Sequence, residues 1–527
     1  MSSILLPIPV VDLFAGPGGL GEGFSSFENS DAFQIAVSAE KDPVAYQTLR
    51  LRAFYRLLVK NRPESINDYY RFCNGESDIP FSTETQDLWD LASKEAMCIE
   101  IGSPEGNAAL DKAIQKMLIK HGDRPWVLIG GPPCQAYSLV GRARNKGKTN
   151  YIPEEDLRHF LYREYLRIIQ KHQPDIFVME NVKGILSSKV NGEKIFNQIL
   201  KDLANPCEAL HMPVQGQCYR IVSLISDQEF CNDDDPKLLD ATKYIIRTEE
   251  YGIPQARHRV ILLGIREDRY AENLPKLSSQ NIISVKNVIG KLPQLRSRLS
   301  KQKDTSEQWQ IQVREQLHSL AKHAEKIPDA RKALSNCLQK ASEEIGSFTK
   351  TGCTRMPKGH YTGQTNNRHL DEWFLDSHLK VWLNHEARSH RIDDLARYGY
   401  AACFALVNKR SPKGHEEFNL PGLAPAHKNW KTGMFSDRFR VQVANSPSTT
   451  ITSHISKDGH YFIHYDPSQC RSLTVREAAR LQTFPDNYFF QGGRTQQYHQ
   501  VGNAVPPLLA AKIAEIVYKI IKININQ

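Results

Sequence analysis

The residues best suited to chemistry are a cysteine and a glutamate, each at the end of an apolar run. Cys134 follows Gly130-Gly131-Pro132-Pro133, and the two prolines stiffen the turn that carries it. A thiol presented rigidly at the open end of a strand suits a covalent nucleophile better than core packing. The other nine of the ten cysteines are read more simply as buried apolar residues. They form no CxxC pair, so neither a zinc site nor a disulfide framework is indicated.

Glu180 ends another apolar run, in Glu180-Asn181-Val182. Taken alone, a charged and solvated carboxylate is an equally good interpretation. In an apolar crevice its pKa would rise, and it could then donate a proton to a heteroaromatic ring. Together, a thiolate and such an acid suit one reaction in particular. The thiolate attacks carbon 6 of cytosine, protonation of nitrogen 3 polarises the ring, and carbon 5 accepts a methyl group.

Two arginines could assist this pair. In Gln255-Ala256-Arg257-His258-Arg259 the side chains alternate, so Gln255, Arg257 and Arg259 share one face of a predicted strand. Guanidinium groups on that face could bind the carbonyl oxygen of a base and a nearby phosphate. A basic strand on the surface is the competing interpretation.

A glycine-rich turn predicts a nucleotide-like ligand. Phe14-Ala15-Gly16-Pro17-Gly18-Gly19 lies where a predicted strand passes into a helix, and glycines there allow close approach of a ligand to the backbone. Glu40, at the end of the next predicted strand, is placed to accept hydrogen bonds from two ribose hydroxyls. An adenosine-containing ligand is favoured, but these residues do not distinguish a methyl donor from a dinucleotide.

The elements that must position these residues are short buried strands separated by helical stretches. The apolar runs are the one ending in Asp12, then Gln34 to Ala39, Trp126 to Ile129, Asp175 to Met179 and Val260 to Gly264. Polar or reactive residues follow most of them directly. This pattern predicts an α/β fold with a mostly parallel, doubly wound sheet whose carboxyl edge carries the site.

Beyond residue 266 the pattern changes. A polar helical stretch from Ser306 to Ile345 precedes Gly-, Pro- and Asn-rich sequence, in which residues 460–465 alternate like a strand. Helical sequence returns from Arg471, and the chain ends in an amphipathic helix. We therefore predict a catalytic domain in two pieces, 1–266 and 471–527, with an inserted domain at 267–470.

Composition supports a globular protein acting inside the cell. The chain has 527 residues, a net charge of +9, 40% hydrophobic and 24% charged residues. No run approaches the about 20 apolar residues of a membrane span, and the first ten residues lack a basic signal region. We expect cytoplasmic localisation and no membrane partner. The net charge permits a polyanionic partner, although basic clusters such as the one from Arg142 to Lys148 are usually solvated faces.

Six motifs resemble those of the cytosine-5 DNA methyltransferase family, in that family's order. They are DLFAGPGG, GGPPCQAYS, MENVKG, QARHR, RSLTVREAARLQTFPD and VGNAVPP. With their flanking strands they account for about half of the chain. The resemblance implies a Rossmann-like class I methyltransferase domain with an inserted target-recognition domain, of the prokaryotic restriction–modification type.

The resemblance also implies roles for individual residues. Cys134 would be the nucleophile, Glu180 the acid and Arg259 a contact to the cytosine carbonyl, with Arg257 beside it. Phe14, Gly16, Gly18, Glu40, Asn503 and Val505 would line the pocket for S-adenosyl-L-methionine, with no metal. A mobile lid from Tyr137 to about Arg158 would close over a flipped base. The expected DNA contacts are Gln135, Ser138, Arg142, Arg144 and Gln255.

The resemblance implies a monomer that binds double-stranded DNA, with a separately encoded restriction endonuclease as its companion. Two features depart from the family: a long stretch between Glu40 and Cys134, with an apparent insertion at residues 67–86, and a long inserted domain. If Met97 to Ile101 is the intervening strand, Ser103 or Glu105 lies near the adenine site. The alternatives are an RNA methyltransferase, whose Cys-Phe-Thr signature is absent, and a non-catalytic DNA-binding relative. A dehydrogenase would explain neither the Pro-Pro-Cys turn nor Glu180.

Overall fold

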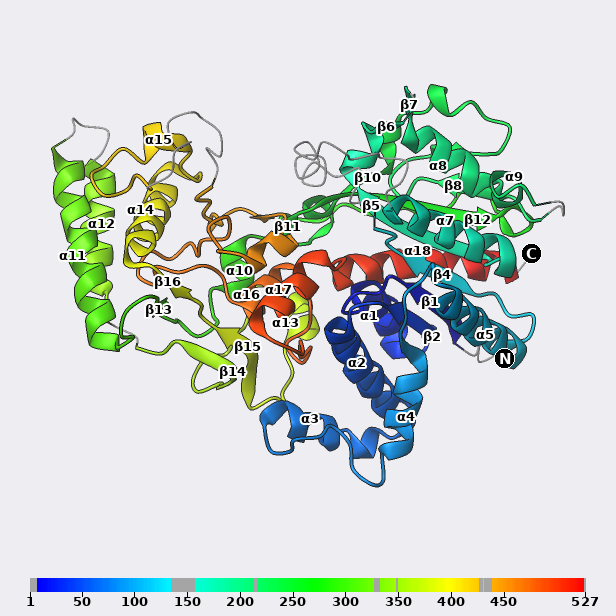
Figure 1. The fold of residues 1–527 in the computed structure, drawn as a ribbon, viewed down its shortest axis with the longest axis horizontal. Coiled ribbons are helices and arrows are strands. Elements are labelled where there is room, and N and C mark those ends of the chain that lie inside the picture. Colours follow the sequence, from blue (N-terminus) through cyan, green and yellow to red (C-terminus); the bar gives the residue numbers. More distant parts are fainter. Residues whose placement is uncertain are drawn as a thin grey trace.

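A large sheet forms the centre of the protein. The structure, a computed structural model, describes residues 7–133, 157–190, 192–212, 216–326, 332–346, 349–425, 430 and 438–525. Beside the α/β lobe built on this sheet stands a second lobe of helices and short strands (Figure 1). Short helices of the C-terminal third lie between the two.

The strand order of the sheet is β3-β2-β1-β4-β5-β12-β8-β9, with β10 also paired to β12. From β3 to β5 all pairs are parallel, whereas β12 pairs antiparallel with β5, β8 and β10. The predicted runs are confirmed as strands, and Met97 lies in β3. The strands are β1 (Ile8–Leu13), β2 (Phe33–Glu40), β3 (Ala96–Cys98), β4 (Val127–Gly130), β5 (Ile176–Val182), β8 (Tyr219–Val222), β9 (Glu229–Phe230), β10 (Ile245–Arg247) and β12 (His258–Arg266).

Helices cover both faces of the sheet, because neighbouring apolar side chains of a strand point to opposite sides. Val10 packs in the core formed with α1 and α18, whereas Val11 packs in the core formed with α5, α7 and α8. The mostly parallel, doubly wound α/β domain is therefore confirmed. The helices are α1 (Gly19–Ser26), α2 (Pro43–Asn61), α5 (Pro104–His121), α7 (Leu157–His172), α8 (Ile195–Ala204) and α18 (Pro507–Ile525).

The C-terminal segment completes the α/β lobe. Helix α16 (Val475–Leu481) begins at a capping box in which Thr474 and Glu477 satisfy each other's backbone N–H groups. Helices α17 (Arg494–Asn503) and α18 follow, and all three share one core with β1, β4 and β5. Strand β11 (Gln255–Ala256) pairs with β17 (Ser448–Thr449), which ties the middle of the chain to this segment. The predicted helices after Arg471 and at the C-terminus are confirmed.

The second lobe has its own apolar core. Helices α11 (Ser306–Glu325), α12 (Lys332–Glu344) and α14 (Ile392–Asn408) pack together around buried Trp309 and Leu338. The predicted helical stretch from Ser306 to Ile345 is thus two helices packed against each other. This core is separate from the two cores of the sheet.

The segments that lead into the second lobe pack against the α/β lobe. Helices α10 (Val285–Ile289) and α13 (Arg368–Phe374) contribute to the core of α1 and α18, as does Trp382 of β15 (Val381–Glu386). Strand β15 pairs antiparallel with β14 (Gly352–Pro357). The domain boundaries at residues 267 and 470 stay a prediction. By their packing, α10, α13 and β15 belong to the core of the α/β lobe, although they lie within the predicted inserted domain.

The predicted strand at residues 460–465 is wrong. Only Ile463 forms isolated bridges there, to Val441 and Ser472. Polar and apolar side chains are both buried in this segment, and neighbouring positions are buried together, as Phe462, Ile463 and His464 show. The alternation therefore did not mark one buried and one solvated face. Among the described residues, no helix combines the length and apolar character that a bilayer span requires.

Candidate active site

The glycine turn after β1 is shaped around the carboxylate of Glu40. The Gly16 N–H donates to Glu40 Oε2 at 2.8 Å, and the Asp42 N–H donates to Glu40 Oε1 at 2.7 Å. Phe14 and Gly16 both have positive φ, 55° and 57°, and a β-carbon on Gly16 would meet no atom within 4 Å. An ionised carboxylate with one donor on each oxygen can still accept bonds from two neighbouring hydroxyls. The predicted residues therefore fit an adenosine-type ligand beside the turn.

Burial acts on two carboxyl groups at this edge of the sheet. It raises the pKa of Glu40 above its usual value, although backbone N–H groups oppose the effect. Asp12, at the end of β1 beneath Gly21 of α1, is 1% exposed, and burial raises its pKa to about 8. The sequence singled out Asp12 only as the end of a strand. Its burial could not be read without knowing that α1 covers it.

The C-terminal segment closes the other side of the turn. A β-carbon on Gly19 would lie 2.3 Å from the carbonyl oxygen of Val505, so only glycine permits this approach. Val505 is 8% exposed, whereas Asn503, the last residue of α17, has an exposed side chain. The structure thus brings Val505, predicted for the cofactor pocket, to the start of α1, although it lies nearly 490 positions away in sequence.

The ends of β4, β5 and β12 meet at one point. Arg259 Nε lies 2.9 Å from Glu180 Oε1, and both side chains are mostly buried. A β-carbon on Gly131, just after β4, would lie 3.1 Å from Glu180 Oε2. The backbone that continues through Pro132 and Pro133 to Cys134 therefore starts directly against the Glu180 carboxylate. Cys134 itself lies outside the described residues, as do the predicted DNA contacts Gln135, Ser138, Arg142 and Arg144.

Two of the predicted contact residues are corrected by the structure. Gln255 is fully buried; its amide nitrogen donates to the Leu481 carbonyl and to Gln482, and its oxygen accepts from the Ile451 N–H. Gln255 therefore has no exposed surface for DNA.

Arg257 is also buried, and its Nη1 donates to the carbonyl oxygens of Ile451 (3.0 Å) and Gly502 (3.3 Å). Burial, with Arg259 close by, lowers the pKa of Arg257 to about 9. In this structure the Arg257 side chain joins β11–β12, the residues after β17 and the end of α17.

Gln482 is a residue that sequence reasoning missed. Its Nε2 donates to the carbonyl oxygens of Val501 and Ala504, while its oxygen accepts from Gln255. The two glutamines together hold the end of α16, the VGNAVPP turn and β11 in one arrangement. The sequence indicated this role only by placing a glutamine within the LQTFPD motif.

Near the expected adenine site, the Ser103 side chain forms its hydrogen bonds with neighbouring residues of its own segment. Its hydroxyl caps α5 by accepting from the Gly106 N–H at 3.0 Å and donates to the Glu100 carbonyl. Glu105 lies in the first turn of α5 and is exposed. Glu100, which follows β3 more closely, forms an ion pair with Lys41, the neighbour of Glu40.

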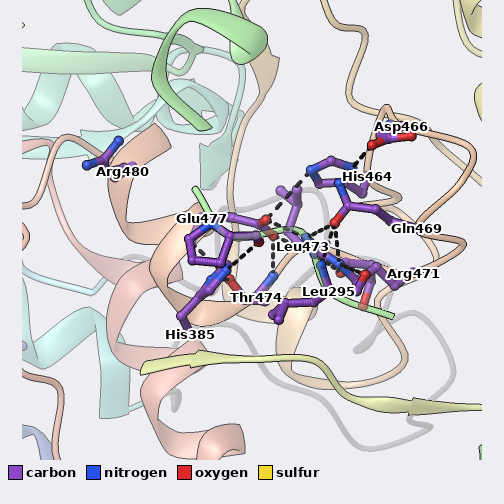
Figure 2. Close-up of polar contacts among 12 residues, drawn as sticks. Leu295, His385, His464, Asp466, Gln469, Arg471, Leu473, Thr474, Glu477 and Arg480 are labelled. Atoms are coloured by element: carbon purple, nitrogen blue, oxygen red, sulfur yellow. Dashed lines mark hydrogen bonds and ion pairs between the residues drawn. The ribbon is translucent and has the colours of Figure 1, made fainter. Parts of the chain in front are cut away.

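A buried polar network stands where the second lobe joins α16 (Figure 2). Arg471 donates to both carboxylate oxygens of Glu477, at 2.7 and 2.6 Å, and both side chains are 1% exposed. His385 of β15 contacts Thr474 at 3.0 Å, and His464 lies 3.6 Å from Glu477. Burial acts to raise the pKa of Glu477, but Arg471 outweighs it and holds that pKa well below its usual range. This network fixes the RSLTVREAARLQ motif to the strand that enters the second lobe.

The carboxyl edge of the sheet thus places the mostly buried Glu180 beside Arg259 and next to the turn that leads to Cys134. The sequence profile of the C-5 cytosine-specific DNA methylase family matches residues 109–206 and 241–519, more than half of the chain. The chain belongs to this methylase family. Its predicted activity as a DNA (cytosine-5) methyltransferase is thereby confirmed, and the activity implies S-adenosyl-L-methionine as co-substrate.

Two relatives of this methylase match nearly end to end. Type II methyltransferase M.Bpa9945I of Bacillus paralicheniformis is 32% identical over 97% of this chain and 99% of its own. Type II methyltransferase M.AgeI of Thalassovita gelatinovora is 26% identical over 96% and 98%. The predicted restriction–modification type agrees with both. Among solved structures, a putative DNA modification methyltransferase from an E. coli prophage covers 98% of this chain and 99% of its own, at 18% identity and a TM-score of 0.49. The fold assignment rests on the sheet itself.

Proposed function

We propose that this methylase modifies carbon 5 of cytosine within a specific sequence of double-stranded DNA, through a flipped base and a covalent adduct on Cys134. The observation that carries the proposal is the meeting of Glu180, Arg259 and Gly131 at the carboxyl edge of the sheet. A base presented there would find an acid for its ring nitrogen and a cation for its carbonyl oxygen. The thiol three residues beyond Gly131 would then lie within reach of carbon 6.

The chemistry follows from these groups. The Cys134 sulfur forms a bond to carbon 6 while Glu180 delivers a proton to nitrogen 3, so that electron density moves to carbon 5. Carbon 5 would take the methyl group from the sulfonium of S-adenosyl-L-methionine, whose sulfur keeps the electron pair of the broken bond as the neutral thioether leaves. A base would then remove the proton from carbon 5. The electron pair of that C–H bond re-forms the 5,6 double bond, and the thiolate leaves. Arg259, whose Nε lies 2.9 Å from Glu180 Oε1, holds that carboxyl group in place.

The base must leave the helix for this geometry to be reached, at a cost of a few kcal/mol. Within a duplex, stacked neighbours cover the faces of carbon 5 and carbon 6. The lid from Tyr137 to about Arg158, with Gln135, Ser138, Arg142 and Arg144, is proposed to grip the DNA around the flipped nucleotide. Apart from residues 157 and 158 at the start of α7, these residues lie outside the described part of the chain.

The cofactor side of the site is proposed to use Phe14, Gly16, Gly18, Glu40, Asn503 and Val505. S-adenosyl-L-methionine supplies an electrophilic methyl group when bound. Glu40 would accept hydrogen bonds from the ribose hydroxyls, since each of its oxygens has a single backbone donor. The open space at Gly16 would admit the ligand against the backbone.

The second lobe is proposed to recognise the DNA sequence from within residues 267–470. We further propose a monomer that acts in the cytoplasm on chromosomal DNA and is accompanied by a separately encoded restriction endonuclease. The relatives' type II classification supports the last point.

Bisulfite sequencing of plasmid DNA from cells that express the protein tests the proposal. The wild type should protect cytosines at one short recurrent site, and Cys134→Ala should protect none. DNA carrying 5-fluorocytosine at that site should form a denaturation-resistant adduct with the wild type alone, because fluorine cannot leave as a proton does. Folded protein that protects no cytosine would contradict the proposal, and methylation of tRNA would then identify RNA as the substrate.

A further inference from the structure

Residues 62–95, called the insertion below because they include the one expected at residues 67–86, reach from the end of α2 to the base of the second lobe. The insertion leaves the end of α2, forms α3 (Asn67–Asn74), and returns through α4 (Gln86–Glu95) to β3. In Figure 1, α3 lies below the hairpin of β14 and β15, away from the sheet that the insertion left. None of the six methyltransferase motifs includes these residues.

A buried polar node joins α3 to the segment before β15. The Tyr70 hydroxyl, on a side chain that is 4% exposed, donates to Asp376 Oδ2. Asn487 donates to the same oxygen at 2.7 Å, and the Tyr70 ring stacks on His378 with centroids 4.7 Å apart. Burial acts to raise the pKa of Asp376, but hydrogen bonds from Tyr70, Asn487 and His378 outweigh it and lower that pKa. The carboxylate is thus held ionised between an inserted helix and the LQTFPD loop.

A second contact clamps the backbone that leads into β15. The Asn74 amide donates to the His378 carbonyl at 3.1 Å and accepts from the Lys380 N–H at 2.9 Å. On β14, Arg355 donates to the Cys73 carbonyl at 3.2 Å. Around these bonds lies a separate apolar core shared by α2, the insertion and the hairpin: Leu51, Ala53, Phe54, Leu58, Tyr69, Tyr70, Cys73, Leu88, Ala92, Leu379, Val381, Leu383 and Phe489.

The node also connects to the cofactor side of the α/β lobe. Asn487 Oδ1 accepts from Arg52 of α2 at 3.0 Å, and Arg52 forms a buried ion pair with Glu22 of α1. In the other direction, β15 runs through β16 (Ser389–His390) into α14, the central helix of the second lobe. The insertion therefore contacts α2, which is ion-paired to α1 through Arg52, and also the backbone that leads into β15.

We propose that the insertion is a strut, with Tyr70 and Asn74 as positioning residues that hold β15, and through it the second lobe, in the orientation that engages target DNA. The inference rests on the proposed recognition role of that lobe. Without the strut, β15 would keep its pairing with β14 and its contacts to α16, but its N-terminal end would be free to move. A smaller population of correctly docked lobes would weaken the apparent affinity for DNA by the same factor.

The test is the double variant Tyr70→Phe/Asn74→Ala in the full-length enzyme. It removes the Tyr70–Asp376 bond and the two Asn74 backbone bonds while keeping the apolar packing of the tyrosine ring. We expect the KM for target DNA to rise about tenfold, which corresponds to a docked fraction of about one tenth. The kcat at saturating DNA and the KM for S-adenosyl-L-methionine should stay within twofold, and backbone amides of β15 should exchange faster with deuterium.

Asp90→Asn is the matched control, because Asp90 is exposed on α4 and accepts only from Gln86 within the same helix. Faster exchange in β15 with an unchanged KM for DNA, or a loss confined to kcat, would overturn the strut. Should the double variant not fold, Asn74→Ala alone can be tested by the same measurements, because Asn74 lies at the exposed edge of the contact. A wild-type enzyme that does not discriminate target from unrelated DNA would instead overturn the recognition role of the lobe.

Discussion

Two buried histidines beside Glu477 should make the junction of the lobes sensitive to acid. Burial lowers the pKa of His385 and of His464 to about 4, from the usual 6.5, with Arg471 also opposing their protonation. Glu477, and for His464 also Asp466, act in the opposite direction but do not outweigh burial. The folded protein thus keeps both rings neutral in a pH range where the unfolded chain protonates them.

The sign and size follow from linkage. A histidine with a depressed folded pKa contributes stability that is present above pH 6.5 and is lost as pH falls from about 6.5 toward 4. Between pH 7.5 and 5.5, each histidine should cost the folded state between about 1 and 2 kcal/mol, and the pair about 3 kcal/mol in total. Asp12 acts oppositely in this window, because its raised pKa of about 8 stabilises the folded state as pH falls. The pH dependence of the wild type's free energy of unfolding therefore combines opposing contributions. The difference in that free energy between the wild type and a histidine variant isolates the contribution of the histidines.

The assay is urea unfolding of the wild type and of His385→Gln/His464→Gln at both pH values. The variant is expected to be less stable at pH 7.5, because packing and hydrogen bonds change. That deficit should shrink by about 3 kcal/mol at pH 5.5, since glutamine does not titrate. His369→Gln, at an exposed position of α13, should show the same small difference at both pH values. A deficit in the buried double variant that does not change with pH would refute the reasoning.

Four further predictions concern the site and the turn beside it. Glu180→Gln should lower kcat by about 10²–10⁴-fold, the usual contribution of a general acid, and a single-turnover rate within tenfold of wild type would contradict that role. Arg259→Ala should lower kcat as well, while the Kd for S-adenosyl-L-methionine, measured by equilibrium binding, should stay unchanged. Glu40→Ala should show the converse, a KM for S-adenosyl-L-methionine raised about tenfold or more by the loss of two charge-assisted bonds, with DNA binding intact by gel shift. Gly19→Ala should destabilise the fold, because the new methyl group would overlap the Val505 carbonyl; an unchanged melting temperature would show that α1 can move away.

The strands and the site motifs could be predicted because each depends on local sequence. Apolar runs ended by Asp12, Glu40 and Glu180 mark parallel strands and their carboxyl ends together, and all of them proved to be strands. Gln255 and Arg257 could not be placed in the same way, since alternation sets the face of a strand but not what covers it. Their partners lie about 200 residues further along, at Ile451 and Gln482. The insertion was recognisable as extra length, but its contacts with Asp376 and Lys380 depend on tertiary packing alone.

The close packing of α1 against the C-terminal segment also bears on how the protein is made. The face of α1 that carries Gly19 and Gly23 is covered by residues from Ala504 to Ala511, which leave the ribosome after nearly all the rest. At about 5–20 residues per second, the glycine turn would wait on the order of a minute for its cover. During that time the apolar side of the sheet would need protection from aggregation. The proposed cofactor pocket would also remain incomplete, so a chain truncated before residue 504 should carry no methyltransferase activity.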